Sequence, residues 1–407
     1  MPDKNCPTGI LPTEIKKLVD SRREVKKLIC DMKATPEEKQ QLDIKQKALK
    51  LTANSMYGCL GFSNSRFYAK PLAAMITAKG REILNNTKQL AESLGFEVIY
   101  GDTDSIMINT NSSNFDDARS IGFKLQAEIN KQYKLLEIGI DGVFRSILLL
   151  KKKKYAAVVA TKENNQIKFT KEVKGLDIVR RDWSVIARKV GEQVLDEILS
   201  FDKTSEQITD NIHNYLSYIA KEINEKKLTL NNYIISKQLT KNPEDYADKK
   251  SLSHVVVALR MNESEKRSRS FKSGDTIPYL ICINKEDKAF NQLPSTQRAI
   301  HPEELKENPN LEIDAKYYLQ QQIHPIVSRL CDPIDGTNAN VIAEFLGIES
   351  TMSVQQKGAD LDFELISRSN ETPSIEKKIF NCKELQSNSF SKYVTNRRGI
   401  LFHKMYK

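Results

Sequence analysis

Two aspartates separated by one residue, Asp102 and Asp104, have the types and spacing best suited to chemistry in this sequence. The apolar runs 98–100 and 106–108 flank them, and both runs predict short buried strands. In extended backbone, side chains at positions i and i+2 project from the same side. A carboxylate pair on such a rigid base suits Mg²⁺, which is usually held by one or two carboxylates plus substrate phosphates. The ordinary alternative is a β-hairpin whose Gly-Asp turn is merely acidic.

Two predicted helices, about 13–30 and 37–57, carry the next group of chemical side chains. Thr13 is the expected N-cap of the first helix. Thr35 and Pro36 predict the N-cap and first residue of the second. Because only a short turn separates the helices, they should form an antiparallel hairpin. The stretch 58–61, which has a glycine at each end, is expected to break the second helix.

Polar side chains recur on one face of each of these helices. Lys50, Asn54 and Tyr57 fall on one face of the second helix, where a cation, an amide and a phenol could bind phosphate, sugar and base edge. Arg22 and Lys26 are spaced i, i+4 on the first helix. Across the hairpin, these two cations and Lys50 could converge on one anion as highly charged as a triphosphate. The alternative is a set of ordinary solvated helix faces.

A basic run, 151–154, continues an apolar strand and is followed by Tyr155. If the strand continues, alternate lysines point to opposite faces and one face presents a basic row to a phosphate backbone. A second basic stretch, 174–182, precedes a helix and contains Lys174, Arg180 and Arg181. The alternatives are a solvated edge for the first stretch and a surface ion pair of Arg181 with Asp182 for the second.

Several local patterns predict secondary structure farther along the chain. Residues 72–94 and 115–134 should be helical, and the Asn164-Asn165 pair should turn a hairpin within a β-rich stretch. Residues 255–259 and 279–283 have the composition of strands. A helical region should begin near Trp183. From about residue 350, Ser, Asn, Gln, Glu and Lys with weak periodicity predict a poorly packed tail.

Composition restricts the classes of partner and compartment. The 407 residues allow two or three domains, and a net charge of +10 favours an anionic partner, with nucleic acid preferred over a membrane surface. No apolar run approaches the ~20 residues that a membrane span requires, and no signal peptide is evident. The six cysteines show no CxxC pair, which argues against a zinc ribbon or a disulfide framework and favours an intracellular protein.

Four of these stretches, in this order, resemble motifs of the B-family DNA polymerases. Residues 50–58 resemble KxxxNSxYG, 100–105 resemble YGDTDS, and 153–155 resemble the template–primer-binding KxY motif. Residues 174–182 resemble the start of the thumb. The residues around these motifs are most similar to the alpha class of eukaryotic members, over roughly residues 9–350.

The resemblance implies an α+β fold of right-hand polymerase architecture. In it, the fingers domain is a helical hairpin, the palm is an antiparallel sheet and the thumb is mixed but largely helical. The expected division is 1–12 a remnant of the upstream palm, 13–58 fingers, 59–176 palm, 177–350 thumb and 351–407 the tail. The implied partners are primer–template DNA, deoxynucleoside triphosphates, and primase with accessory subunits, in the nucleus and with no membrane.

The resemblance also implies a role for each candidate residue. Asp104 would be a direct metal ligand and Asp102 a nearby one, with two Mg²⁺ ions and no zinc site. The remaining implied roles are triphosphate binding by Arg22, Lys26 and Lys50, contact with the nascent base pair by Asn54 and Tyr57, and DNA binding by Lys153, Tyr155, Lys174, Arg180 and Arg181.

One family motif is not found in this sequence. The second metal-binding Asp, followed by Ser-Leu-Tyr-Pro, should precede the fingers. We therefore expect a fragment of a template-directed DNA polymerase that binds DNA but is inactive alone. The alternative is a nucleic-acid-binding protein that has lost its chemistry.

Overall fold

The computed structural model describes residues 7–30, 35–112, 114–133, 136–263, 270–349 and, for the backbone, 399–406. Two compact units divide the chain, Met1–Ser93 and Leu94–Lys407. Helices and antiparallel sheets confirm the α+β prediction. No helix within these ranges is long and apolar enough to cross a membrane. The expected domain division stays a prediction, since residues 1–6 and 350–398 lie outside the described residues.

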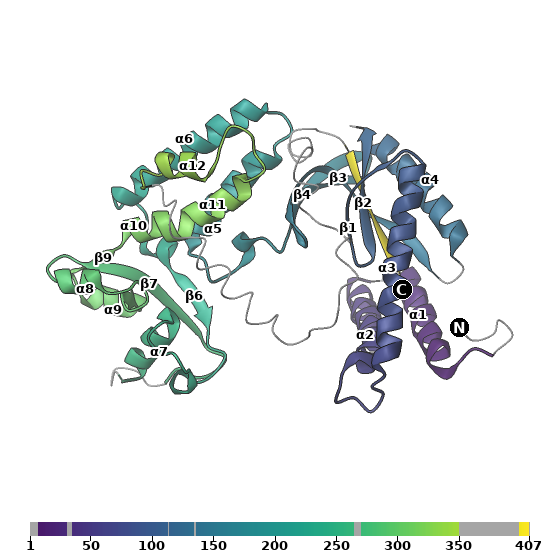
Figure 1. The fold of residues 1–407 in the computed structure, drawn as a ribbon, viewed down its shortest axis with the longest axis horizontal. Coiled ribbons are helices and arrows are strands. Elements are labelled where there is room, and N and C mark those ends of the chain that lie inside the picture. The colour runs from purple at the N-terminus through teal and green to yellow at the C-terminus, as the bar shows by residue number, and fades with distance from the viewer. Residues whose placement is uncertain are drawn as a thin grey trace, which may run out of the picture. The chain divides into compact units, whose positions relative to one another are not determined.

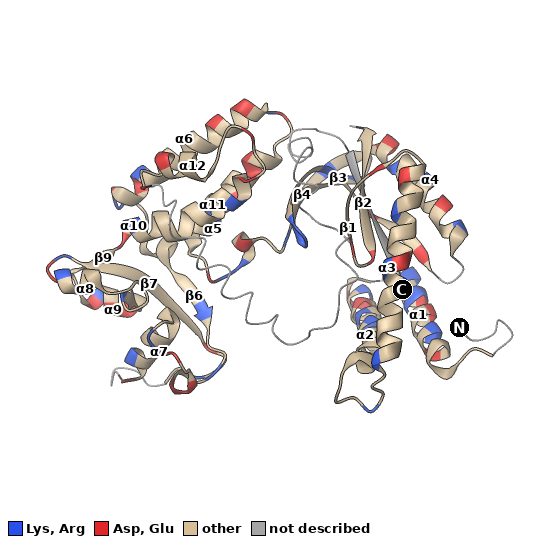
Figure 2. Cartoon of the chain, in the orientation of Figure 1, with Lys and Arg blue, Asp and Glu red and all other residues tan. Residues whose placement is uncertain are grey.

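The first unit consists of α1 (Ile10–Ile29), α2 (Pro36–Gly61) and α3 (Lys70–Ser93) (Figure 1). The predicted start of α2 is confirmed. Thr35 Oγ1 accepts the Glu38 N–H at 3.2 Å, and Glu38 accepts the Thr35 N–H at 2.8 Å, which is a capping box. Lys and Arg residues occur along both α1 and α2 (Figure 2).

Two expected helix ends in this unit were wrong. α1 begins at Ile10, and the Thr13 hydroxyl donates back to the Gly9 carbonyl at 2.8 Å instead of capping. α2 continues through Gly58 to Gly61. A helical glycine costs only about 1 kcal/mol, and burial of Leu60 at 7% exposure offsets that cost.

The second unit begins with a six-stranded sheet whose paired strands are all antiparallel, in the order β1-β2-β10-β3-β4-β5 (Figure 1). The strands are β1 (Glu97–Asp102), β2 (Ser105–Ser112), β3 (Glu137–Lys151), β4 (Lys154–Glu163), β5 (Gln166–Lys174) and β10 (Gly399–Tyr406). Helix α4 (Phe115–Gln132) buries Leu125 and Ile129. The predicted Asn164-Asn165 turn is confirmed, with φ of 47° and 66°.

Strand β10 departs from the predicted tail. It inserts between β2 and β3, with Phe402 opposite both Met107 and Gly142. Residues 400–406 are mostly apolar or aromatic, a composition that suits a strand, but the weak periodicity of the longer stretch hid them. The rest of the tail, 351–398, lies outside the described residues.

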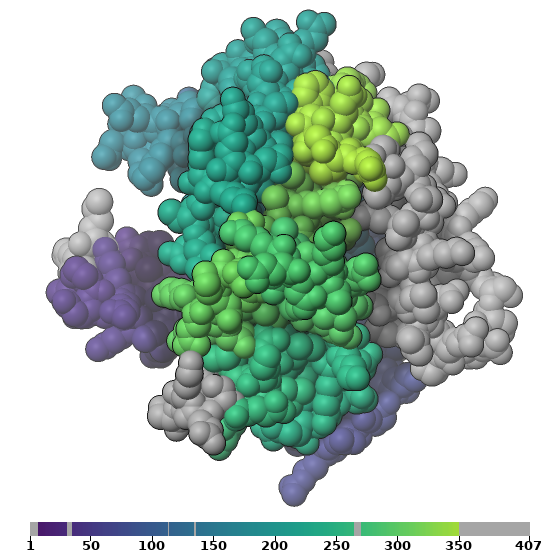
Figure 3. All heavy atoms as spheres, turned by 90° about the vertical axis from the view of Figure 1, so that its left-hand side faces the viewer, coloured from purple at the N-terminus to yellow at the C-terminus, as the bar shows by residue number. Residues whose placement is uncertain are grey.

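Residues 176–349 form a largely helical region around a small sheet, and their side chains make one continuous surface from teal to yellow-green in Figure 3. Its α-helices are α5 (Val185–Leu199), α6 (Ser205–Asn224), α7 (Ser253–Glu263), α8 (Lys288–Gln292), α9 (Pro302–Glu307), α10 (Ala315–Tyr317), α11 (His324–Cys331) and α12 (Ala339–Phe345). Its 3-10 helices are η1 (Asp177–Val179), η2 (Leu230–Tyr233) and η3 (Pro243–Asp245). A π-helix, η4 (Tyr318–Ile323), leads into α11.

In the small sheet, β7 (Thr276–Asn284) pairs with β6 (Ile235–Gln238), β8 (Ala299–Ile300) and β9 (Leu311–Ile313). The predicted strand at 279–283 is confirmed within β7. The strand predicted at 255–259 is wrong, because those residues belong to α7. Burial of Val255, Ala258 and Met261 recurs every three residues, a helical spacing that a five-residue window does not reveal.

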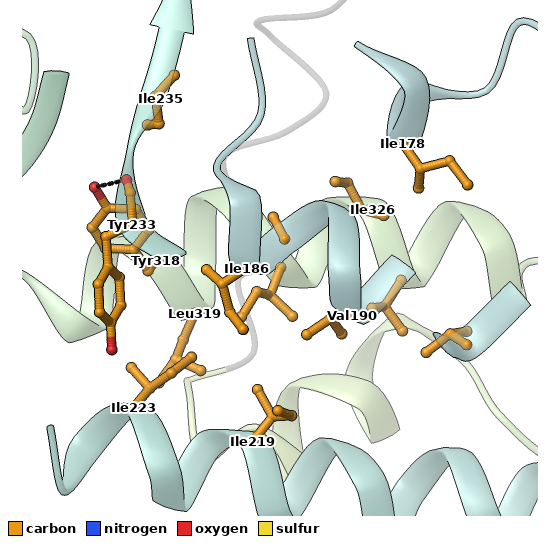
Figure 4. Packing of buried hydrophobic residues seen from close by; sticks show 14 of the residues in the cluster. Ile178, Ile186, Val190, Ile219, Ile223, Tyr233, Ile235, Tyr318, Leu319 and Ile326 are labelled. Carbon is orange, nitrogen blue, oxygen red and sulfur yellow. Dashed lines mark hydrogen bonds between the residues drawn. The ribbon is translucent and has the colours of Figure 1, made fainter. Parts of the chain in front are cut away.

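The core of this region contains a completely buried tyrosine. Tyr318 has 0% exposure, and its hydroxyl donates to the Tyr233 carbonyl at 2.8 Å (Figure 4). The same hydroxyl accepts the Ile281 N–H at 3.1 Å. Both hydrogen bonds satisfy the buried hydroxyl, which would otherwise destabilise the core. Ile186, Val190 and the neighbouring aliphatic side chains fill the remaining space between the helices (Figure 4).

Candidate active site

The aspartate pair lies at the end of the β1–β2 hairpin. Asp102 pairs with Ser105, so Thr103 and Asp104 form a two-residue turn, with Thr103 at φ 54°. The Asp104 N–H donates to the Asp102 carbonyl at 2.6 Å, and the Thr103 hydroxyl donates to Asp102 Oδ1 at 3.2 Å. The predicted hairpin is confirmed, but the extended-backbone argument for the pair was wrong, because the turn itself sets where the two carboxylates lie.

Strand β2 gives this turn a rigid base. Ile106, Met107 and Ile108 are at most 1% exposed. Both aspartates stay partly accessible, with the Asp102 side chain 20% exposed. The pair is therefore fixed by a buried strand while its oxygens can still reach a ligand.

The basic run 151–154 is a hairpin turn and not a continuing strand, which corrects the alternating arrangement predicted above. Lys151 pairs with Lys154, and Lys152 and Lys153 form the turn between β3 and β4. Lys153 has a φ of 63°, a left-handed conformation that non-glycine residues rarely adopt. The direction of the Lys153 side chain is therefore set by the turn, and the alternation of side chains along a strand does not apply to it.

Two contacts join this lysine turn to the aspartate hairpin. The Lys153 N–H donates to the Tyr100 hydroxyl at 2.9 Å, and Lys153 Nζ lies 3.8 Å from Asp102 Oδ2. The Lys153 side chain is 66% exposed, so its ammonium can still contact a second anion. The structure thus places a cation beside the candidate metal ligand.

Gly175 packs against the same turn from the end of β5. Its φ is 65°, and a Cβ at this position would lie 2.3 Å from the Lys153 carbonyl oxygen. Only glycine permits both the left-handed backbone and this close approach. The preceding residue, Lys174, is exposed and forms an ion pair with Glu172 at 2.8 Å.

Tyr155 is half-buried, with its ring 6.5 Å from that of Phe144. Burial, with a smaller contribution from the negative charge of Glu172, raises the pKa of Tyr155 to about 12. Its hydroxyl therefore stays protonated and can donate a hydrogen bond at neutral pH. The packed ring restricts how far it can move toward a ligand.

Asp177 connects the lysine turn to the helical region. It accepts from Arg329 at 2.5 Å, and Lys154 Nζ lies 3.5 Å away. Partial burial alone would raise the pKa of the Asp177 carboxyl, but the hydrogen bond and charge of Arg329, with Lys154, hold that pKa below its usual value. The carboxylate is therefore ionised at neutral pH.

Arg180 and Arg181 are both exposed, as a surface for phosphate requires. The alternative, an ion pair of Arg181 with Asp182, is not what the structure shows, because Arg180 is the residue whose Nε lies 3.8 Å from Asp182. This pair is largely exposed and weakly stabilising. Both guanidinium groups remain available to an anion.

In the first unit, α1 contacts α2 through Arg22, whose Nε donates to Gln46 Oε1 at 3.2 Å. Gln46 and Lys50 are one helical turn apart on α2, and Lys26 is one turn from Arg22 on α1. Lys50 is exposed. Convergence of the three cations on one anion stays a prediction.

Asn54 and Tyr57 continue the exposed face of α2 beyond Lys50, and Tyr57 is 40% exposed. A large exposed aromatic beside an amide and a cation is chemically suited to a nucleotide. The contact of Asn54 and Tyr57 with a base pair also stays a prediction.

The donor atoms of the aspartate pair fit Mg²⁺. The described ranges contain no group of three or more His, Cys, Asp or Glu side chains that could hold a metal ion. Two carboxylates suit an ion that takes its remaining ligands from substrate phosphates and water. Any such ion would therefore be shared between Asp102, Asp104 and a substrate.

Three residues in this arrangement received no role from the sequence. Tyr100 was seen only as a strand residue at the start of the YGDTDS-like stretch, and Asp177 only as part of a basic stretch, although each lies beside a predicted residue. Arg329 is 152 residues from Asp177 along the chain, and no local pattern points to it. The one usable signal for these three residues was the position of Tyr100, in the strand that leads into the acidic turn.

Comparison with known proteins gives consistent matches. Residues 2–334 match DNA polymerase family B. The chain is 53% identical over 352 residues to the DNA polymerase alpha catalytic subunit of Mus musculus, which covers 86% of this chain and 24% of that protein. It is 50% identical over 354 residues to the DNA polymerase alpha catalytic subunit of Drosophila melanogaster, covering 86% of this chain and 23% of that protein.

A solved structure agrees with these matches. The family B DNA polymerase of Pyrobaculum calidifontis superposes with a TM-score of 0.58 at 27% identity, over 81% of this chain and 38% of that chain. The resemblance and the fold predicted from the motifs are confirmed. The chain spans about a quarter of the length of these two curated relatives.

Proposed function

Because this chain belongs to DNA polymerase family B, we propose that it acts in template-directed addition of deoxynucleotides to a primer 3′ end. The parent activity would be that of a DNA-directed DNA polymerase in replication initiation, in the nucleus and alongside primase and accessory subunits. The contact between Lys153 and Asp102, 3.8 Å apart, supports this function most directly. It sets an exposed cation beside a carboxylate, so a primer phosphate and a metal ion could be held next to each other.

Asp104 and Asp102 would hold Mg²⁺, with two ions in the working enzyme. When bound, such ions activate the attacking hydroxyl and stabilise charge on the transferred and leaving phosphate oxygens. The protein contributes the fixed position of both carboxylates, which the Thr103-Asp104 turn and the buried β2 strand determine. Preorganised oxygens lose little entropy when the ligand arrives.

Lys153 and the other exposed cations of the second unit would bind the primer–template backbone. The Lys153 ammonium contacts Asp102 from one side and is 66% exposed, so a primer phosphate can approach it. Lys174, Arg180 and Arg181 would add phosphate contacts, and the protonated Tyr155 hydroxyl would donate to the primer strand. Such contacts orient DNA without reading its sequence.

The first unit would bind the incoming nucleotide. Arg22, Lys26 and Lys50 would hold the triphosphate, because three cations match its charge. Asn54 and Tyr57 would line the nascent base pair, on the same exposed face of α2 as Lys50. We further propose that the 407-residue chain alone binds DNA but does not extend it, because two carboxylates bind Mg²⁺ weakly.

The test uses the 407-residue chain with a dideoxy-terminated primer–template and the next deoxynucleotide. Mn²⁺ replaces Mg²⁺, and electron paramagnetic resonance measures the bound fraction. We expect Mn²⁺ binding in this ternary mixture to be lost in Asp104→Asn while DNA affinity is retained. Lys153→Gln should keep Mn²⁺ but flatten the log–log salt dependence of DNA binding by about 0.9.

The matched control is Lys249→Gln, a change of the same charge at an exposed lysine before α7. It should leave both the Mn²⁺ signal and the salt dependence unchanged. Equal Mn²⁺ binding by the parent chain and Asp104→Asn would refute the catalytic proposal and favour the non-catalytic DNA-binding alternative. Primer extension that depends on Asp104 would support the polymerase function and contradict our expectation of inactivity.

A further inference from the structure

A small apolar pocket lies in the helical region, where α6 ends near η2 and β9. Its volume is about 200 Å³, enough for one large aliphatic or aromatic side chain. The apolar part of its lining comes mainly from Ile223, Leu230, Leu305, Leu311, Ile313 and Ala315. An open apolar pocket of this size on a protein surface is suited to one anchoring side chain of a partner.

Two lysines meet at one carboxylate of the pocket: Lys226 and Glu312 line it, and Lys285 is ion-paired to Glu312. Lys226 Nζ lies 2.5 Å from Glu312 Oε2, and Lys285 forms an ion pair with the other oxygen of the same carboxylate. Hydrogen bonds from Lys226 and Lys285 lower the pKa of Glu312, so that carboxylate is ionised. Two lysines therefore share one negative charge, and a further carboxylate would be attracted here.

The backbone at Lys226 is unusual in the same place. Lys226 follows the end of α6 with a φ of 57°, in the left-handed region where a helix usually places glycine. A lysine there is less favourable for folding than glycine, but it brings an ammonium to the pocket. Its side chain is 64% exposed and can contact a partner.

We propose that this pocket binds a protein partner through one leucine or phenylalanine side chain that has acidic residues next to it. The apolar lining receives the side chain, and the excess charge of Lys226 and Lys285 contacts the acidic neighbours. The pocket involves none of the residues assigned above to metal, nucleotide or DNA. The inference therefore stands independently of the proposed catalytic function.

The test probe is a synthetic pentapeptide with a central leucine between two acidic residues on each side. Methyl NMR of the 407-residue chain should show shifts at Leu230, Leu311 and Ile313. A peptide with serine in place of the leucine should bind at least tenfold more weakly, because the apolar side chain is lost. A peptide with amides in place of the carboxylates should lose about threefold for each lysine contact.

Two variants separate binding from folding. Ala315→Leu fills the pocket and should abolish the leucine-dependent part of binding. Lys226→Gly removes the cation but suits the left-handed backbone, so binding should fall about threefold while Tm stays the same or rises. Lys249→Gln is the control and should bind like the parent chain.

Each contrary outcome overturns the proposal. Methyl shifts confined to other residues would place the peptide elsewhere. Equal binding of the leucine and serine peptides would show a charge effect without an anchoring side chain. Unchanged binding by Ala315→Leu, or by Lys226→Gly, would show that the pocket or its cation is not involved.

Discussion

Replacement of Gly175 by alanine should destabilise the second unit by about 2–3 kcal/mol. Alanine at a φ of 65° costs about 1–2 kcal/mol, since the left-handed region disfavours a Cβ. The new Cβ would also lie 2.3 Å from the Lys153 carbonyl, so the lysine turn must shift. Loss of the hydrogen bond from the Lys153 N–H to Tyr100 adds about 1 kcal/mol.

Urea unfolding and thermal melts of the variant measure this loss, which corresponds to a fall in Tm of about 4–12 °C. The matched control is Gly347→Ala, because Gly347 has nearly the same φ, 64°, with no atom within 4 Å of its added Cβ. The control should lose only the conformational part, about 1–2 kcal/mol.

DNA binding provides a second measurement on the same variant. If the turn shifts, Lys153 leaves its position beside Asp102, and the log–log salt slope should flatten by about 0.9. Equal destabilisation by Gly175→Ala and Gly347→Ala would refute the role of the close contact. An unchanged salt slope would refute the link between Gly175 and the position of Lys153.

Three further predictions concern single contacts. Tyr100→Phe removes the acceptor of the Lys153 N–H and should cost about 1 kcal/mol in urea unfolding, whereas a loss below about 0.3 kcal/mol would contradict this contact. Arg329→Gln should reduce the acid dependence of stability. Because the pKa of Asp177 is lowered on folding, its contribution is complete above the unfolded pKa of about 3.9 and is lost as pH falls through the folded value. Unfolding free energies from pH 6 to pH 3 should therefore fall less steeply in the variant, and identical slopes would exclude Asp177 as the cause. Gly61→Ala should lengthen no helix but raise Tm slightly, since its added Cβ meets only Ala73 at 3.9 Å, and a lower Tm would show that α2 needs its terminal glycine.

Local sequence rules predicted those elements whose partners are close along the chain. The N-cap at Thr35, the Asn164-Asn165 turn and the hairpin around Asp102 all depend on residues within a few positions of each other. The same rules failed at residues 255–259, where the β-branched residues favoured a strand. In the structure these residues lie within an eleven-residue helix, and its buried side chains follow the helical spacing.

The site was predictable by residue type but not by contact. The carboxylates and cations were visible in the sequence, whereas the hydrogen bond between Tyr100 and Lys153 joins residues 53 positions apart. The alternating-strand argument for the lysines failed because Lys153 adopts a left-handed conformation that its residue type does not suggest. Only tertiary packing against Gly175 shows why that conformation is kept.

Strand β10 has a consequence for how the second unit is synthesised and folded. About 300 residues separate Met107 from its partner Phe402, so the sheet cannot be completed until the chain has been translated as far as β10. Until then, the edges of β2 and β3 that β10 later occupies are both unpaired. Contacts this distant slow folding, and unpaired strand edges can associate with other chains. Cells that produce this chain would therefore need chaperones most during the interval between synthesis of β3 and synthesis of β10.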